Sequence, residues 1–382
     1  MRAHHLQDLS ARSTSDDRDG APLAMTNADH LVYADDRLPG ISRRRRGKGF
    51  SFHLPGGERI TDKAETARLM AIGMPPAYQR CWFNPDCAGH IQATGYDAKG
   101  RKQYRYHPDF RQHRDFAKFS LCMAFGQALP AMRARVDRAL RARTMTRERC
   151  LAAIVRLLDI AHIRIGNRQY AQQNRSFGVS TLHKRHVTVR PDAIELKFVG
   201  KSGKLHHRIL HDRALLKIVR DLQDLPGQHL FKWVDEDGQI HAITSGDVNR
   251  TIAEVMGPGF SAKHFRTWHG TLAAFRAWRN ARAPVALDAV MRIVADELGN
   301  TPAVSRKSYV HPAVIAAIRN KSAPPAPTKL PPPDRWLQPE ERALIAFLKA
   351  SASAAHTPAR NKSLARQLFH GHPKKHKETR HG

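Results

Sequence analysis

The chain has 382 residues, which is enough for two domains that each bury a core of their own. Its 64 lysines and arginines against 34 acidic residues give a formal net charge of +30. A solvated surface needs no such excess, so we expect a polyanion as the partner. No run of 18 apolar residues and no basic amphipathic anchor is present, and the stretch from Met1 to Met25 lacks the apolar segment of a secretory signal. These features exclude a membrane protein and favour a cytoplasmic one.

The four cysteines do not form the spacing of a disulfide framework, and they fit a reducing compartment. Cys81, Cys87 and His90 lie close together, but their spacing is irregular and a fourth ligand is missing. Structural zinc sites have four ligands. We therefore predict no metal site in this chain.

Residues 1–28 are polar and without periodicity, which is typical of disorder, and residues 29–115 are predicted to form a β-rich domain. Within it, a run of arginines continues to a lysine and then into the alternating Phe50 and Phe52, a strand pattern. Such cations could belong to a solvated tail, but a charge run that leads into a strand is better placed to contact backbone phosphates. The candidates are Arg43, Arg44, Arg45, Arg46 and Lys48. Farther on, Thr61 is expected to cap a short helix that ends near Ile72.

The segment 89–107 alternates aromatic and polar residues around a Lys99-Gly100 turn, which predicts a β-hairpin. Cations and amides interleaved with tyrosines suit a surface that lies along a nucleic-acid backbone. The alternative is that one tyrosine face is buried in a sheet. The candidate contacts are Gln92, Arg101, Lys102, Gln103, Tyr104 and Tyr106.

A second, mainly helical domain is predicted over residues 116–320. It contains a helix with an apolar stripe over residues 151–158, which Thr146 can cap. Arg164 is expected at the end of this helix, between two isoleucines and just before a Gly166-Asn167 helix stop. This long cation needs a partner, either a carboxylate or a phosphate. Residues 186–210 alternate as strands, and Lys201 occupies a basic hairpin tip from which it can reach a ligand.

Another helix begins at Ser261 and carries Lys263 and Arg266 in its first turns, where backbone N–H groups also favour an anion. A helical pattern over residues 287–298 then stops at Gly299, and Pro302 opens a new helix with Thr301 as its N-cap.

Asn300 therefore lies at a sharp junction between the two helices, and Tyr309, next to the basic Lys307, falls about two turns into the second one. The alternative interpretation is that Tyr309 is a core tyrosine on a basic surface helix.

Residues 321–382 comprise a proline-rich linker, a short amphipathic helix around Leu344 and Leu348, and a basic tail after Ser351. The tail is expected to be disordered and to add non-specific affinity for DNA.

One tyrosine, two arginines, one lysine and one amide make a set suited to phosphoryl transfer. Arginine forks match the non-bridging oxygens of a phosphate, a tyrosine can be the covalent nucleophile, and a lysine can protonate the leaving oxygen. No acidic cluster suited to Mg²⁺ is evident, and arginines can carry the charge without a metal.

The chain resembles the type IB DNA topoisomerases, specifically their bacterial and poxvirus-like branch, over about residues 30–318. The resemblance rests on the order and spacing of several motifs. These are residues 40–50, 89–107, Ile163–Gly166, Ser176–Leu182, Lys197–Lys201, Lys263–Thr267 and Gly299–Pro302 with Ser308–Tyr309.

This resemblance implies that Tyr309 forms a 3′-phosphotyrosyl link, that Arg164 and Arg266 hold the phosphate, and that Lys201 is the general acid. Many family members have histidine where this chain has Asn300, which can still donate a hydrogen bond but cannot carry charge.

The fold implied is α+β, with a small β-rich N-terminal domain and a larger, mainly α-helical catalytic domain that close around double-stranded DNA as a clamp. The expected enzyme is a nucleoid-associated monomer that relaxes supercoils without ATP, another nucleotide or a cofactor.

Two alternatives remain open at this point. A tyrosine recombinase would share the catalytic chemistry, but such enzymes usually carry His-x-x-Arg where this chain has Lys263-x-x-Arg266, and they lack the 89–107 hairpin domain. A non-catalytic DNA-binding protein would explain the charge but not the catalytic set.

Overall fold

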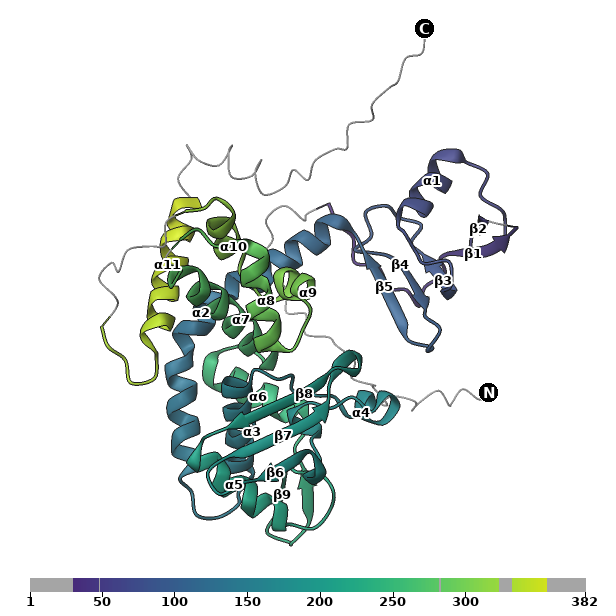
Figure 1. The fold of residues 1–382 in the computed structure, drawn as a ribbon. Helices are drawn as coiled ribbons and strands as arrows, with labels where there is room; N and C mark the ends of the chain where they lie inside the picture. Colours follow the sequence, from purple (N-terminus) through teal and green to yellow (C-terminus); the bar gives the residue numbers. More distant parts are fainter. Residues whose placement is uncertain (1–29, 48, 282, 323–331, 356–382) are drawn as a thin grey trace, which may run out of the picture. The chain divides into compact units, whose positions relative to one another are not determined.

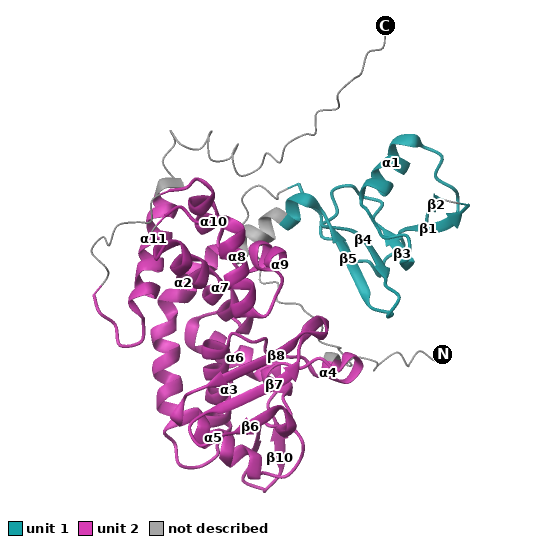
Figure 2. Cartoon of the chain, in the orientation of Figure 1, with its two compact units in different colours: residues 1–117 teal, residues 118–382 magenta. Residues whose placement is uncertain are grey.

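The computed structural model describes residues 30–47, 49–281, 283–322 and 332–355 (Figure 1). The N-terminal segment 1–28, Lys48, much of the proline-rich linker and the tail beyond 355 lie outside the described residues. The chain divides into two compact units, residues 1–117 and 118–382, and the helix α2 (Pro108–Leu140) begins in the first and continues in the second (Figure 2).

Unit 1 is built on a five-stranded antiparallel sheet in the order β2-β1-β3-β4-β5. Its strands are β1 (Ile41–Arg46), β2 (Gly49–His53), β3 (Gln79–Phe83), β4 (Ile91–Tyr96) and β5 (Lys102–Tyr106). The arginine run itself forms β1, and Phe52 and Phe83 pack edge to face in a small core with Ile41 and Leu69. The predicted hairpin is confirmed, since β4 pairs with β5 around a turn at Gly100.

The helix of unit 1 is α1 (Lys63–Ala71), and its N-cap differs from the prediction. Asp62, not Thr61, is the cap, because the Asp62 carboxylate accepts hydrogen bonds from the backbone N–H groups of Ala64 and Glu65 at 3.1 and 3.3 Å. Aspartate and threonine both suit this position, and sequence alone does not separate two adjacent candidates.

Unit 2 is mainly helical. Its helices beyond α2 are α3 (Arg147–Ala161), α4 (Arg168–Asn174), α5 (Arg213–Asp224), α6 (Ser245–Met256), α7 (Ala262–Arg279), α8 (Leu287–Leu298), α9 (Pro302–Ser308), α10 (Pro312–Arg319) and α11 (Pro339–Ala355). The cap predicted for α3 is confirmed, since Thr146 accepts from the N–H of Arg149 at 3.2 Å. The helices α3 and α7 are buried along most of their length and form the centre of the core.

Two small sheets accompany these helices. One has the order β6-β7-β8, with β6 (Val187–Val189), β7 (Ile194–Val199) and β8 (Leu205–Leu210), as the alternation predicts. The other is a ribbon of β9 (Lys232–Val234) and β10 (Ile240–Ala242), which the sequence pattern does not predict. Strands of three residues carry too few positions to show a period. In both units, no helix of the described residues is long and apolar enough to cross a membrane.

The junction between α8 and α9 forms as predicted. Gly299 ends α8 in the left-handed conformation, with φ 63°, and the Thr301 hydroxyl accepts from the N–H of Val304 at 3.3 Å. The prediction for Tyr309 needs a correction, because α9 ends at Ser308 and Tyr309 is its C-cap with φ −133°. The chain then starts a separate helix, α10, whose N-cap is His311.

Candidate active site

Arg164 lies in the loop after α3, and not on a helix as the sequence interpretation had it. The helix ends at Ala161, and His162 turns the chain with φ 55°. The backbone here is held by the next loop, since the N–H of Val179 donates to the Arg164 carbonyl at 2.9 Å. Nη2 of Arg164 donates to Oδ1 of Asn300 at 2.8 Å, which brings together two predicted site residues that are 136 positions apart.

Arg266 is almost fully buried on α7, with 2% of its surface exposed. Its guanidinium donates to the carbonyls of His162 and Leu298, the latter at 3.0 Å, and its Cζ lies 4.8 Å from the centre of the Tyr309 ring. Burial and the nearby positive charge of Arg164 lower the pKa of Arg266 to about 10. Arg266 is therefore a fixed cation against the tyrosine.

Tyr309 lies beside two cations, the guanidinium of Arg266, whose Cζ is 4.8 Å from its ring, and that of Arg164. Burial alone would raise the pKa of its hydroxyl, but the nearby positive charges of Arg266 and Arg164 outweigh burial, so the pKa lies below its ordinary value. Opposite charges at close range favour the ionised form, and a phenolate is the better nucleophile. The arrangement thus favours ionisation of the Tyr309 hydroxyl.

Asn300 is buried, with 8% of its surface exposed. While Arg164 holds its Oδ1, its Nδ2 is a buried donor without a hydrogen-bond partner among the described residues, and the same is true of Nε of Arg266. A buried donor left unsatisfied costs about 1–3 kcal/mol, so natural structures keep few of them. Two such donors beside an activated tyrosine are suited to bind the oxygens of an incoming anion.

Lys201 lies exposed in a short turn, Lys201–Gly203, at the tip of the β7-β8 hairpin. The tip is attached to the Asn300 junction, because Nζ of Lys204 donates to the Asn300 carbonyl at 2.8 Å. The buried ring of His206 fills the space between them: a Cβ on Gly200 would lie 2.6 Å from this ring, and one on Gly299 would also lie 2.6 Å from it. These contacts set the position of the hairpin tip relative to Asn300.

Four residues that sequence reasoning missed therefore shape this site: Lys204, His206, Gly270 and Thr271. Gly270 lies on α7 directly against Tyr309, and the Thr271 hydroxyl shares its proton between the carbonyls of Thr267 and Tyr309, at 2.8 and 3.2 Å. The available signal was Gly270 itself, because a glycine inside a helix costs about 1 kcal/mol relative to alanine and implies a close approach.

In unit 1, some of the side chains predicted to contact DNA are exposed, whereas others are already bound to carbonyls of the same unit. Arg44, Arg45 and Arg46 are exposed on β1. Arg43 instead donates to the carbonyls of Met74, Pro75 and Tyr78 at 2.8, 2.8 and 3.1 Å, so it holds the loop before β3.

Gln92 is buried as well, and its amide donates to the carbonyls of Cys87 and Gly89 at 2.9 and 2.7 Å. Arg43 and Gln92 therefore have structural roles in this unit.

The hairpin candidates lie together on β5 and its turn. Arg101 and Gln103 both donate to Asp97, at 2.8 and 3.2 Å, and Lys102 pairs with Asp36 at 2.5 Å. The rings of Tyr104 and Tyr106 stack with centroids 5.9 Å apart, and Tyr104 is 40% exposed.

In unit 2, Lys263 and Lys307 are exposed, on α7 and α9 respectively.

Potential metal ligands gather once in the part of the chain that the structure describes, where His30, His107 and Asp109 of unit 1 lie within 4.8 Å of one another. His30 and Asp109 are joined directly by a hydrogen bond of 3.2 Å, which accounts for their proximity. This group contains none of the catalytic candidates.

Comparison with known proteins decides the family. The model of the eukaryotic DNA topoisomerase I catalytic core matches residues 107–324, and that of the bacterial DNA topoisomerase IB N-terminal domain matches residues 49–97. A DNA topoisomerase 1B of Acanthamoeba polyphaga mimivirus is 31% identical over 288 residues, which cover 72% of this chain and 85% of the relative. The chain belongs to the type IB DNA topoisomerases.

More distant relatives agree with this membership. The DNA topoisomerase I of monkeypox virus and the DNA topoisomerase 1B of vaccinia virus (strain Copenhagen) are each 22% identical over 259 residues, covering 64% of this chain and 77% of the relative. The interpretation as a type IB topoisomerase, an isomerase that acts on DNA, is thereby confirmed over the recombinase and non-catalytic alternatives. Its mixed architecture, a β-rich N-terminal unit and a helical second unit, agrees with the fold expected for this topoisomerase.

Proposed function

We propose that this topoisomerase relaxes supercoiled DNA through a covalent link between Tyr309 and the 3′ phosphate of one cleaved strand. The Tyr309 phenolate attacks the phosphorus, the P–O5′ bond breaks, and the strand is freed as a 5′-hydroxyl. The position of Tyr309 against the buried guanidinium of Arg266, whose Cζ lies 4.8 Å from the tyrosine ring, is the observation that carries this proposal, and the charges of Arg266 and Arg164 lower the pKa of Tyr309 against the effect of burial. After strand rotation the 5′-hydroxyl attacks the phosphotyrosine, so the bond energy is conserved and no ATP is needed.

Charge on the non-bridging oxygens grows as the phosphorus is attacked. We propose that Arg164, Arg266 and Asn300 stabilise this negative charge. The unsatisfied Nδ2 of Asn300 and Nε of Arg266 are donors ready for those oxygens, and the guanidinium of Arg164 fixes which way the Asn300 amide points. Fixed donors aimed at developing charge need no reorganisation during the reaction. Because Asn300 does not titrate, this contact should not depend on pH.

Lys201 is proposed as the general acid that protonates the leaving O5′. Support comes from the attachment of its hairpin to the Asn300 junction through Lys204 and the His206 ring. The turn is exposed, so Lys201 keeps the freedom to reach the leaving group once DNA is bound. A positioned acid contributes roughly 10²–10⁴-fold to such steps.

Unit 1 is proposed to bind the DNA backbone with Arg44, Arg45, Arg46, Arg101, Lys102 and the Tyr104–Tyr106 stack, so that the two units close around the duplex as a clamp. Lys263 and Lys307 add exposed charge on the helices that carry Arg266 and lead to Tyr309. We propose that the enzyme acts as a monomer, because one chain supplies every catalytic group, and without a nucleotide or an obligatory metal, because arginines supply the positive charge.

The test is a plasmid relaxation assay in EDTA without ATP, with wild type and Tyr309→Phe, followed by denaturing gels that trap protein-linked DNA. We expect relaxation and a protein-linked 3′ end from wild type alone, with DNA binding retained by the variant. Relaxation by Tyr309→Phe, or an adduct on the 5′ end, would refute the proposed chemistry.

A further inference from the structure

The helix α11 lies beyond the residues that match the topoisomerase catalytic core, which end at residue 324. It is nevertheless packed into unit 2 beside α7 (Figure 1). Leu344 and Leu348 are buried, and the Phe347 ring lies 5.5 Å from that of Phe275 and 5.4 Å from that of Trp278. The sequence predicted this helix but not whether it packs against the rest of the unit.

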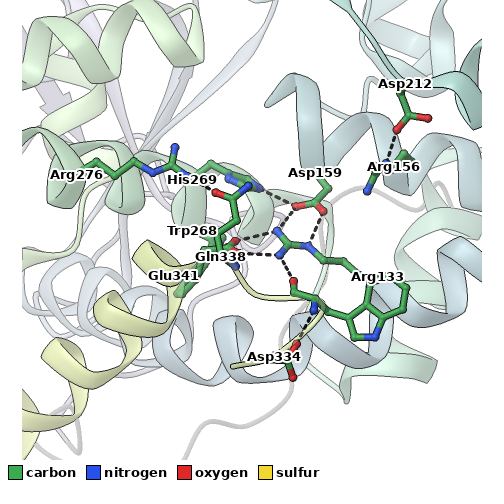
Figure 3. Close-up of polar contacts among 11 residues, drawn as sticks. Arg133, Arg156, Asp159, Asp212, Trp268, His269, Arg276, Asp334, Gln338 and Glu341 are labelled. Carbon is green, nitrogen blue, oxygen red and sulfur yellow. Dashed lines mark hydrogen bonds and ion pairs between the residues drawn. The ribbon is translucent and has the colours of Figure 1, made fainter. Parts of the chain in front are cut away.

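One carboxylate of α11 is buried together with these apolar side chains. Glu341 is 1% exposed, and both of its oxygens accept hydrogen bonds from Arg133, each at 2.8 Å (Figure 3). Oε1 also accepts from Nε1 of Trp268 at 3.1 Å, and Oε2 from the N–H of Gln338 at 2.9 Å. The Glu341 carboxylate therefore accepts four hydrogen bonds. Removing its negative charge would leave Arg133 with only one of its two carboxylate partners.

Arg133 connects this carboxylate to a second one. Its Nε and Nη2 donate to the two oxygens of Asp159 at 2.8 and 3.0 Å, and Asp159 in turn lies 2.9 Å from Nε2 of His269 (Figure 3). The His269 ring stacks on that of His162, with centroids 4.0 Å apart. The carbonyl of His162 accepts the Nη1 hydrogen bond of Arg266. An unbroken series of contacts thus joins α11 to the arginine beside Tyr309.

The same network also holds α7 directly, at two residues that follow Arg266. Trp268 and His269, the residues anchored to Glu341 and Asp159, follow Arg266 by two and three positions on one helix. Rotation of α7 that misplaced Arg266 would therefore break hydrogen bonds at both anchors. Buried and fully paired networks have discrete geometries, which suits them to fix the position of a neighbouring group.

We propose that Glu341 is a positioning residue for Arg266, and that α11 is for this reason a working part of the active site. The inference rests on the proposed role of Arg266 in holding the phosphate. Glu341 itself does not touch the DNA. It acts through Arg133, Asp159 and the two stacked histidines, and through Trp268.

The experiment measures single-turnover cleavage by the full chain on a duplex, recording the rate constant, the amplitude and the DNA dissociation constant. Glu341→Gln keeps the shape but removes the charge and one pair of acceptors. We expect its rate constant to fall about tenfold with unchanged DNA affinity, since misplacement by 1 Å can cost roughly 10²-fold. The matched control, Glu340→Gln, makes the same charge change one position away and should keep the wild-type rate constant.

Two readouts separate positioning from a loss of folded protein. Partial unfolding lowers the amplitude and leaves the rate constant of the remaining enzyme unchanged, so a normal rate constant in Glu341→Gln would overturn the proposal. A 5′-bridging sulfur substrate relieves only a defect in leaving-group protonation, so the Glu341→Gln defect should persist on it, and full rescue would also overturn the proposal.

A second variant covers the case in which Glu341→Gln does not fold. Trp268→Phe removes the Nε1 hydrogen bond and keeps an aromatic ring at this buried position. It should lower the rate constant in the same direction, while any loss of folded protein lowers only the amplitude; a wild-type rate constant there would count against the inference. Failure of the proposed function shows itself separately, as the absence of a Tyr309-dependent adduct in the wild type.

Discussion

Gly270 offers the sharpest test of how the fold places Tyr309. The glycine is buried on α7, and a Cβ at this position would lie 2.8 Å from the Tyr309 carbonyl oxygen and 3.0 Å from both Tyr309 Cβ and Leu298 Cδ1. Ordinary contact for a Cβ begins near 3.4 Å, so Gly270→Ala must move the Tyr309 backbone by about 0.6 Å. That backbone cannot move freely, because the Thr271 hydroxyl accepts from the N–H of His311 at 3.0 Å and shares its proton between the carbonyls of Thr267 and Tyr309, at 2.8 and 3.2 Å.

The effects of Gly270→Ala on stability and on rate should differ in size. Overpacking costs about 1–3 kcal/mol, while alanine gains about 1 kcal/mol of helix propensity over glycine, so the free energy of unfolding should fall by only about 0–2 kcal/mol. A shift of half an ångström between Tyr309 and Arg266 should slow cleavage roughly tenfold, by the scale on which 1 Å costs about 10²-fold.

The assay is single-turnover cleavage of a duplex, paired with urea unfolding of the same protein. Gly246→Ala is the matched control, because this glycine lies in α6 with its nearest neighbour, Oγ1 of Thr244, at 3.6 Å from the added Cβ. It should unfold no more easily than wild type and cleave at the same rate. A folded Gly270→Ala protein that cleaves at the wild-type rate would refute the claim that this close approach sets the position of Tyr309.

Three further outcomes follow from the site and its surroundings. Lys201→Ala should slow cleavage of an ordinary phosphodiester but not of one with a 5′-bridging sulfur, which leaves without a proton; equal slowing of both would show that Lys201 is not the acid. Burial lowers the pKa of His206 to about 4 from 6.5, so folding favours its neutral form and stability is lost as pH falls from 6.5 toward 4. In urea titrations at a series of pH values, the free energy of unfolding should fall less between pH 6.5 and 4 for His206→Gln than for wild type. An equal fall in both proteins would show that His206 is not the group responsible. Deleting residues 356–382, which hold seven lysines and arginines and one glutamate, should weaken DNA binding and flatten its salt dependence in anisotropy titrations; an altered choice of cleavage site would show that the tail does more than add charge.

Most of the local structure of the site could be predicted from the sequence, because that structure depends on short-range signals. The stop at Gly299, the cap at Thr301 and the alternation of β7 each depend on a few neighbouring residues, and each was predicted correctly. The end of α9 at Ser308 was not, because no glycine or proline marks it. The turn there follows from tertiary contacts of Tyr309 with α7.

The long-range polar contacts had no signal in the sequence. Arg133 meets Asp159 across 26 positions and Glu341 across 208, and nothing in their local patterns distinguishes them from surface charges. For Arg43 and Gln92, too, the local sequence did not show which groups the side chains would contact. Both were predicted as DNA contacts from their position in basic or polar runs, and both turn their side chains to carbonyls of their own unit.

A common physical requirement connects these observations. The site must hold Arg164, Arg266 and the hairpin lysines close together, and their mutual repulsion would push them apart. Two features of the structure oppose that repulsion. The carbonyls of His162, Leu298 and Asn300 each accept a hydrogen bond from one of these cations, so the positive side chains are tied to backbone that the core fixes. His206, at the centre, stays neutral because burial lowers its pKa. The cations are thus held in a net positive cluster. In the proposed mechanism, the phosphate that Tyr309 attacks supplies counter-charge to this cluster, so the free energy released when DNA binds is directed to that phosphate.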